Sequence, residues 1–151
     1  MADDEVVRLL QKAYQDEIET VMNYLSNSIV LDGVRAEEIK ESLQTDIQDE
    51  LGHAERIGER LKQLEEAPPG SAAFEARQES LQPPADTTDV PAVIDGVLDA
   101  ENDAIETYRD LIDAARDADD PVTEDLAVTI LGDEEAHRTE FRGYRKEYRK
   151  N

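Results

Sequence analysis

Cysteine is absent from this sequence of 151 residues. The chain therefore has no disulfide framework, no thiolate zinc site and no cysteine-bound iron–sulfur cluster. Basic residues are scarce too, since 16 lysines and arginines stand against 38 aspartates and glutamates, for a formal net charge of −22. Such a chain has no lysine- and arginine-rich face of useful size for DNA or anionic lipid. We therefore expect neither nucleic acid nor a membrane as a partner.

Long apolar runs are also missing. No stretch approaches the ~20 apolar residues that span a bilayer, and residues 1–5 lack the basic and apolar parts of a secretion signal. We therefore expect a cytoplasmic protein. One basic cluster occurs near the C-terminus, and we interpret it as a complement to the negative pole of a helix rather than as a partner-binding patch. Its members are Arg138, Arg142, Arg145, Lys146, Arg149 and Lys150.

Apolar residues still make up 38% of the chain, which is enough for one domain with a hydrophobic core. The acidity is therefore interpreted as a property of the surface rather than as a sign of disorder. An acidic surface stays hydrated in concentrated salt, where charge repulsion is screened. We interpret it as salt adaptation, as in a haloarchaeal protein, and the alternative is an ordinary acidic protein.

The 3.6-residue spacing of apolar positions predicts an all-α protein of four amphipathic helices, with no competing strand signal. Asp32-Gly33 supplies a left-handed stop for the first helix, and Pro68-Pro69-Gly70 ends the second. Pro91 suits a first helical turn, with Thr88 or Asp89 as the cap. The predicted helices span about residues 4–31, 36–66, 91–117 and 121–148 of a single domain.

The connecting segments predict the topology. Short turns make the first two helices, and the last two, antiparallel hairpins. The middle segment, about residues 67–90, can cover up to ~3.3 Å per residue, whereas a helix advances ~1.5 Å per residue. This crossover can therefore travel the full length of the bundle and place the second and third helices parallel. Within it, only residues 72–81 could be helical.

A four-residue signature of Glu, Tyr, Glu and His occurs twice, and each member of the second copy lies 84 positions after its counterpart. The two histidines of the signature are the only ones in the chain. The constant offset predicts that the two hairpins are related by a pseudo-twofold axis. The copies are Glu17, Tyr24, Glu50 and His53, and Glu101, Tyr108, Glu134 and His137.

Each glutamate of the signature takes a position in an apolar stripe where leucine or isoleucine is expected. Carboxylates that face a shared interior repel each other and lose hydration, at a cost of several kcal/mol for each uncompensated ion. Two divalent cations would balance the charge of the four carboxylates, with the imidazoles as neutral ligands. Two helices that give one Glu each, and two that give Glu-x-x-His, are what a dinuclear metal site in a helical bundle requires.

A spacing of three residues keeps both members of each Glu-x-x-His pair on one helix face. Glu50 with His53, and Glu134 with His137, can therefore address one site. The lone glutamate of each remaining helix can then bridge the two ions. Oxygen-rich ligation with one imidazole per metal and no thiolate favours iron or manganese over structural zinc or copper(I).

Four further residues lie beside the ligand positions. Tyr24 and Tyr108 either pack their rings and donate their hydroxyls, with a ligand glutamate as one acceptor, or take part in redox chemistry, and we favour the first role. Asp49 and Asp133 each precede a ligand glutamate and could orient a histidine through its second ring nitrogen. The alternative is that both aspartates are solvated surface acids.

These motifs resemble the bacterioferritin and rubrerythrin branch of the ferritin-like superfamily. The segment Asp16-Glu17-Ile18 that leads to Asn23-Tyr24 is similar to the first helix of bacterioferritins, and residues 49–56 and 133–137 are similar to their two ligand motifs. The resemblance covers nearly the whole chain and implies a ferritin-like bundle with a long crossover. It implies that Glu50 and Glu134 bridge two iron ions. It further implies that the other ligands are Glu17, His53, Glu101 and His137.

The resemblance also implies a function, namely oxidation of Fe(II) by O2 or H2O2 in iron storage or detoxification. It implies a homo-oligomer, either a dimer or a larger shell. Bacterioferritins bind haem through a Met directly after the second-helix Glu, where this chain has Leu51, so we expect no haem by that route. No segment corresponds to the short fifth helix of shell-forming members, which argues against a shell. The cysteine-bound iron module of rubrerythrins cannot form in this chain.

Two other functions remain open at this stage. One is a peroxide-reducing enzyme at the same site, similar to rubrerythrin or to manganese catalase, with manganese in place of iron. The other is a non-catalytic bundle in which the metals are stored or only stabilise the fold.

Overall fold

Four long helices make up most of the computed structural model, which describes residues 2–148. The helices are α1 (Asp4–Val30), α2 (Glu37–Gln63), α3 (Val90–Asp117) and α4 (Pro121–Tyr148). Two short 3-10 turns, η1 (Val34–Ala36) and η2 (Ser71–Ala73), lie in the first and middle connections, and no strand occurs in the described residues. The predicted all-α fold is therefore confirmed. Arg149 and Lys150 of the basic cluster lie outside the described residues.

Aspartate side chains cap the starts of three helices. Asp3 accepts hydrogen bonds from the backbone N–H groups of residues 5 and 6 at the start of α1. Asp89 accepts one from the N–H of Ala92 at 3.2 Å, with Pro91 in the first turn of α3, so the cap is Asp89 and not Thr88. Asp120 does the same for α4. Each cap satisfies an N–H group that has no partner within its helix.

The ends of α2 and α3 share a C-terminal capping motif that the sequence analysis did not predict. Glu65 and Asp119 follow the last turns with left-handed φ angles of 63° and 54°. The N–H of Glu66 then donates to the carbonyl of Leu61 at 2.9 Å, and the N–H of Asp120 to the carbonyl of Ala115 at 2.8 Å. These are Schellman closures without glycine. Helix α2 therefore ends at residue 63, ahead of the prolines that were expected to stop it.

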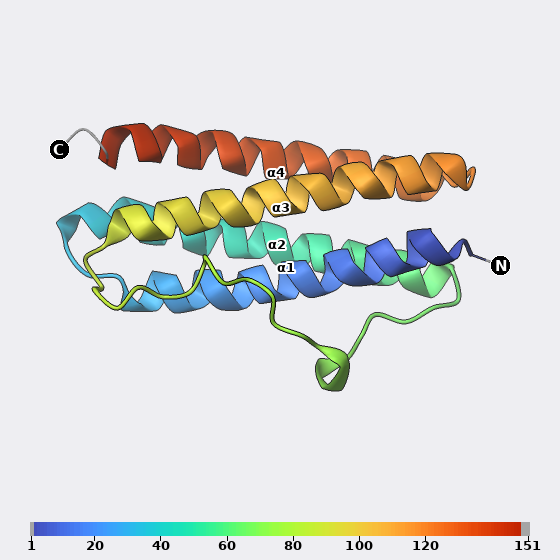
Figure 1. Ribbon diagram of the computed structural model, residues 1–151, viewed down its shortest axis with the longest axis horizontal. Coiled ribbons are helices and arrows are strands. Elements are labelled where there is room, and N and C mark those ends of the chain that lie inside the picture. The colour runs from blue at the N-terminus through green and yellow to red at the C-terminus, as the bar shows by residue number, and fades with distance from the viewer. Residues whose placement is uncertain (1, 149–151) are drawn as a thin grey trace.

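The predicted topology is visible in Figure 1, where α1 and α2 run antiparallel, α3 and α4 run antiparallel, and α2 and α3 point the same way. The crossover returns along the length of the bundle beside α1. Apart from the single turn η2 it has no helix, so residues 72–81 are largely irregular. No helix of the described chain combines the length and apolarity that a membrane span demands.

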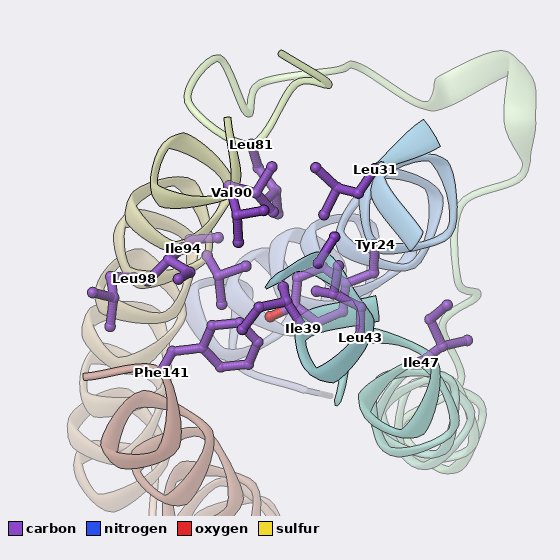
Figure 2. Packing of buried hydrophobic residues seen from close by; sticks show 14 residues of the cluster. Tyr24, Leu31, Ile39, Leu43, Ile47, Leu81, Val90, Ile94, Leu98 and Phe141 are labelled. Atoms are coloured by element: carbon purple, nitrogen blue, oxygen red, sulfur yellow. The ribbon is translucent and has the colours of Figure 1, made fainter. Parts of the chain in front are cut away.

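The apolar core consists of two clusters, one toward each end of the bundle. One cluster joins the C-terminal part of α1 to the first halves of α2 and α3, with Phe141 of α4 and Leu81 of the crossover (Figure 2). The other joins the first half of α1 to the ends of α2 and α3 and the start of α4. The six ligand candidates occupy helix positions between the two clusters, so apolar packing shields the polar layer from both ends.

Candidate metal centre

All four helices contribute to a buried polar layer in the middle of the bundle. The six ligand candidates are at most 7% exposed. Helices α1 and α3 each provide one glutamate, and α2 and α4 each provide a glutamate and a histidine. The layer contains Glu17, Glu50, His53, Glu101, Glu134 and His137.

His53 faces three of these carboxylates with one ring nitrogen. Its Nδ1 lies 3.1 Å from Oε2 of Glu17, 3.0 Å from Oε1 of Glu134 and 4.0 Å from Oε2 of Glu50. Its Nε2 points the other way and lies 2.9 Å from Oδ2 of Asp133. The ring is thus held between a surface aspartate and the interior carboxylates.

His137 has the same arrangement on the other hairpin. Its Nδ1 lies 3.2 Å from Oε1 of Glu50 and 3.9 Å from Oε1 of Glu101. Its Nε2 lies 3.0 Å from Oδ2 of Asp49. These three contacts are the counterparts of His53 contacts after the 84-residue shift, so the pseudo-twofold relation extends to these side chains of the site.

The donor atoms fall into two groups that could each hold one metal ion. Glu17 and His53 form one group, and Glu101 and His137 form the other, each within 4.8 Å together with both Glu50 and Glu134. Glu50 and Glu134 are therefore shared between the groups. Oxygen-rich groups with a single imidazole match the donor preferences of iron and manganese.

Unpaired polar atoms test whether the layer fits metal ions. Within residues 2–148, four buried atoms of the layer make no hydrogen bond of good geometry, although Glu134 Oε1 lies 3.0 Å from His53 Nδ1 and Glu50 Oε1 lies 3.2 Å from His137 Nδ1. Buried polar atoms without partners are costly, and a bound cation would satisfy all of them. They are Glu50 Oε1, Glu101 Oε2, Glu134 Oε1 and His137 Nδ1.

The electrostatics of the layer lead to the same conclusion. Burial, and then repulsion between neighbouring carboxylates, raises the pKa of Glu17, Glu50 and Glu101 well above the usual range. Burial alone would lower the pKa of both histidines, but hydrogen bonds and neighbouring carboxylates raise it to about 9 for His53 and about 11 for His137. These shifts favour protonated carboxyls and imidazoles when no metal is bound.

The two tyrosines cross between the hairpins. The hydroxyl of Tyr24 donates to Oε1 of Glu101 at 2.7 Å, and the hydroxyl of Tyr108 donates to Oε1 of Glu17 at 3.0 Å. Burial raises the pKa of both phenols well above its ordinary value, so they stay neutral donors. This geometry matches the packing and hydrogen-bonding role, with a ligand glutamate as the acceptor in each case.

Asp49 and Asp133 have side chains that are about half exposed, and each accepts from a histidine Nε2. Asp46 is a neighbour that the sequence did not indicate. It is buried, its Oδ1 lies 3.6 Å from Nε2 of His137, and burial raises its pKa to about 6. Its position in the apolar stripe of α2 was the available signal. Its counterpart after the shift is Ile130, so only His137 has two aspartate neighbours.

Comparison with known proteins identifies the family and the relatives that this chain resembles. A family model described as a ferritin-like domain matches residues 7–151. The bacterioferritin of Desulfovibrio desulfuricans is 27% identical over 136 residues, which cover 90% of this chain and 72% of that protein.

Solved structures agree on the fold. A ferritin-like, diiron-carboxylate protein from Bacillus anthracis has a TM-score of 0.84 at 21% identity and covers 96% of this chain and 99% of its own. A dodecameric thioferritin from Bacteroides fragilis, a bacterioferritin-related protein, has a TM-score of 0.84 at 21% identity, over 95% of this chain and 85% of its own. The X-ray structure of Desulfovibrio desulfuricans bacterioferritin has a TM-score of 0.81 at 26% identity, and the match covers 93% of this chain and 78% of that protein's chain.

Proposed function

The chain belongs to the ferritin-like family, and from that premise we propose that it is a di-iron protein that oxidises Fe(II) with O2 or H2O2, in iron storage or detoxification. The observation that supports this function best is the buried layer itself. It brings together two overlapping sets of carboxylate and imidazole donors, one for each of two ions. Two divalent ions would balance the four carboxylates.

We assign the six residues of the layer as the ligands. Glu50 and Glu134 are proposed to bridge the two ions because they belong to both groups of donor atoms. Glu17 and Glu101 are proposed as the terminal carboxylates. The histidines would bind through Nδ1, which faces the carboxylates, while Nε2 donates to an aspartate. When bound, the two iron ions supply the electrons that reduce the oxidant.

The surrounding residues hold this donor set in place. Asp49 and Asp133 fix each imidazole with its Nδ1 directed inward, a role that outer-shell carboxylates have in other metal sites. Tyr24 and Tyr108 each donate to a terminal glutamate and so restrict its rotation. The two apolar clusters keep bulk water away from the layer at both ends. Metal binding must displace the protons that the carboxyls and imidazoles hold in the metal-free chain.

Removal of a bridging carboxylate tests the proposal. Glu50→Ala and Glu134→Ala should slow Fe(II) oxidation in stopped-flow measurements by more than about 100-fold, because loss of an outer-shell partner alone costs about 10–100-fold. The bundle should stay folded by circular dichroism, since each change removes a buried acid. Glu135→Ala, which alters the partly exposed neighbour of Glu134, is the matched control.

The outcomes separate the candidate functions. Oxidation rates in the bridging variants equal to those of the control would contradict the ligand assignment. Slow Fe(II) oxidation together with sustained H2O2 turnover by the manganese-loaded protein would identify a peroxide-reducing enzyme instead. Tight binding of two metals with neither activity would identify a storage or structural bundle.

We also propose that the protein is a homo-oligomer, as its dodecameric relative from Bacteroides fragilis is. The supporting observation is an exposed apolar stripe on α1. Met22, Leu25 and Ile29 are 57%, 50% and 67% exposed and follow one another at helical spacing. Apolar patches of this kind on a soluble chain mark interaction surfaces.

A further inference from the structure

We infer that a pocket between α1 and α3 is the route by which a divalent cation reaches the buried layer, and that Lys12 fills this route as an internal cation which the entering ion displaces. The inference rests on the proposed function, because it concerns the substrate of that same site. It adds a path, a direction of entry and a residue that controls the rate.

The pocket has a volume of about 310 Å³ and is lined by residues of α1, α3 and the crossover. Such a space holds roughly ten water molecules at about 30 Å³ each, which is ample for a hydrated ion. Glu17, a proposed metal ligand, is part of the lining and is itself almost fully buried, so it lies at the inner end. The pocket therefore brings surface residues and one residue of the metal layer together in a single lining.

The charges in the lining favour a cation. Five acidic residues line the pocket, four of them outside the metal layer, against two basic groups, Lys12 and Arg77. A concave surface with an excess of negative charge concentrates cations and repels anions. The carboxylates belong to Asp16, Glu17, Asp103, Glu106 and Asp110.

Lys12 occupies this acidic pocket through two polar contacts. Its Nζ lies 2.8 Å from Oδ2 of Asp16 and 2.8 Å from Oγ1 of Thr107 on α3. The second oxygen of Asp16 lies 3.1 Å from the guanidinium of Arg77. Both oxygens of Asp16 are thus paired with cations of the chain itself. A lysine ammonium carries one charge on a flexible stem, so a divalent ion can replace it at the carboxylate while the stem swings outward.

The pseudo-twofold axis shows how the other half of the bundle differs at the positions that correspond to this pocket. The 84-residue shift relates Lys12 to Gly96, Asp16 to Ala100 and Asn23 to Thr107. At Gly96 the crossover packs against α3 so closely that a Cβ would lie 2.4 Å from the carbonyl oxygen of Ser80. Asn23 donates to Oε1 of Gln78 in the crossover. The position that corresponds to Lys12 is therefore sealed by backbone.

Glu19 holds the crossover against α1 next to this region. Its buried carboxylate accepts hydrogen bonds from the N–H groups of Arg77 and Gln78 at 2.8–2.9 Å. The crossover, which runs beside α1 in Figure 1, is thereby held in place at Arg77 and Gln78, two residues that also line the pocket. The crossover thus covers the bundle at Gly96, whereas the pocket that contains Lys12 includes Glu17 in its lining.

Cobalt(II) entry into the metal-free protein tests the route without any oxidation step. Stopped-flow absorbance gives the rate constant of Co(II) binding, and an equilibrium titration gives its stoichiometry. Lys12→Met should raise the rate constant about 3- to 10-fold, and Asp16→Asn should lower it by a similar factor, because they remove the competing cation and the attracting carboxylate. Both variants should still bind two Co(II) per chain.

Two controls carry the same charge changes away from the pocket. Lys62→Met on α2 and Asp125→Asn on α4 alter exposed residues, and they should change the rate constant less than twofold. Equal rate constants in pocket variants and controls would overturn the route, as would slower entry into Lys12→Met. A wild-type stoichiometry far from two would instead contradict the proposed metal site, so the two failures are distinguishable. Ala104→Phe, which fills the pocket, should slow entry at unchanged stoichiometry.

Discussion

Asp49 and Asp133, each of which accepts a hydrogen bond from a proposed ligand histidine, should differ in how much they contribute to metal binding. Asp133 is the aspartate partner of His53 Nε2, at 2.9 Å, whereas His137 Nε2 has both Asp49 at 3.0 Å and Asp46 at 3.6 Å. We predict that Asp133→Ala lowers Co(II) affinity by about 10–100-fold. Asp49→Ala should cost less, because Asp46 remains beside the imidazole. Competition titration against a chelator measures both effects.

Asp125→Ala serves as the control for this comparison, since it removes an exposed acid of α4 far from either histidine. If Asp133→Ala and the control have the same affinity, these two aspartates are solvated acids and not positioning residues. A conservative Asp133→Asn retains an oxygen acceptor and should recover part of the affinity.

The metal-free layer binds protons, and because these protons are lost as the pH rises, the apo-protein should become less stable at higher pH. Burial opposes protonation of His53, but its carboxylate neighbours prevail and raise its pKa to about 9, against an ordinary value of 6.5. The folded chain then binds this proton more tightly than the unfolded chain does. The stabilisation is complete below pH ~6.5 and is lost as the pH rises through about 9. The raised pKa of Glu50 acts in the same direction.

We therefore expect the apo-protein Tm to fall by about 5–10 °C between pH 6.5 and pH 9. The Co(II)-loaded protein should show the opposite trend, because its ligands must be deprotonated. Calorimetry of both forms measures this. Glu50→Gln removes a carboxyl with a raised pKa and a neighbour of His137, so it should flatten the apo-protein curve. An apo-protein Tm that rises over the same interval would contradict the protonated layer.

At the scale of helices, the sequence predicted what depends on periodicity and missed what depends on local closure. The apolar stripes located all four helices because each must bury one face. The end of α3 at Asp117 agrees with the predicted residue 117, whereas α2 ends at Gln63 instead of about residue 66. The earlier end of α2 was not predictable because Glu65 takes a left-handed φ angle, which its residue type does not indicate. The paired Glu-x-x-His motifs brought together the ligand candidates because helix geometry is rigid.

The crossover could not be predicted in the same way, since its path depends on contacts with residues far away in sequence. The clamp of Glu19 on Arg77 and Gln78, and the packing of Ser80 on Gly96, join segments that show no common pattern. For the same reason Lys12 gave no signal in the sequence. Its importance appears only when α3 and the crossover are placed beside it.

The close packing of the crossover against α3 gives a prediction about the stability of the protein. A Cβ on Gly96 would lie 2.4 Å from the carbonyl oxygen of Ser80 and 3.1 Å from Cα of Leu81, and backbone atoms cannot turn aside. Gly96→Ala should therefore destabilise the protein by about 1–3 kcal/mol. Gly132→Ala, in α4 with no atom within 4 Å of the added group, should stabilise by about 0.5–1 kcal/mol.

Urea denaturation of both glycine variants measures the difference. Because both substitutions favour the helix by the same intrinsic propensity, the gap between them reports the contact with the crossover alone. A Gly96→Ala protein as stable as Gly132→Ala would show that the crossover does not rest on α3 in solution.

At the scale of the whole molecule, the net charge of −22 opposes association of copies, while the apolar stripe of α1 favours it. Salt screens the repulsion and leaves apolar burial intact. We therefore predict that particle mass by light scattering rises from dilute to concentrated KCl. The double variant Leu25→Asp with Ile29→Asp should remain smaller at every salt concentration, because it places charge in the centre of the stripe.

Val128→Asp is the appropriate control for the stripe, since Val128 is a large apolar residue exposed to a similar degree, 49%, on α4. It adds the same kind of charge without touching α1, so its particle mass should follow that of the wild type. If all three proteins have the same mass in concentrated KCl, the stripe is not the contact. A wild-type monomer at every salt concentration would exclude a homo-oligomer, and storage in a shell made of this chain alone would then be impossible. The Fe(II) oxidation site would be unaffected, because all six of its proposed ligands come from one chain.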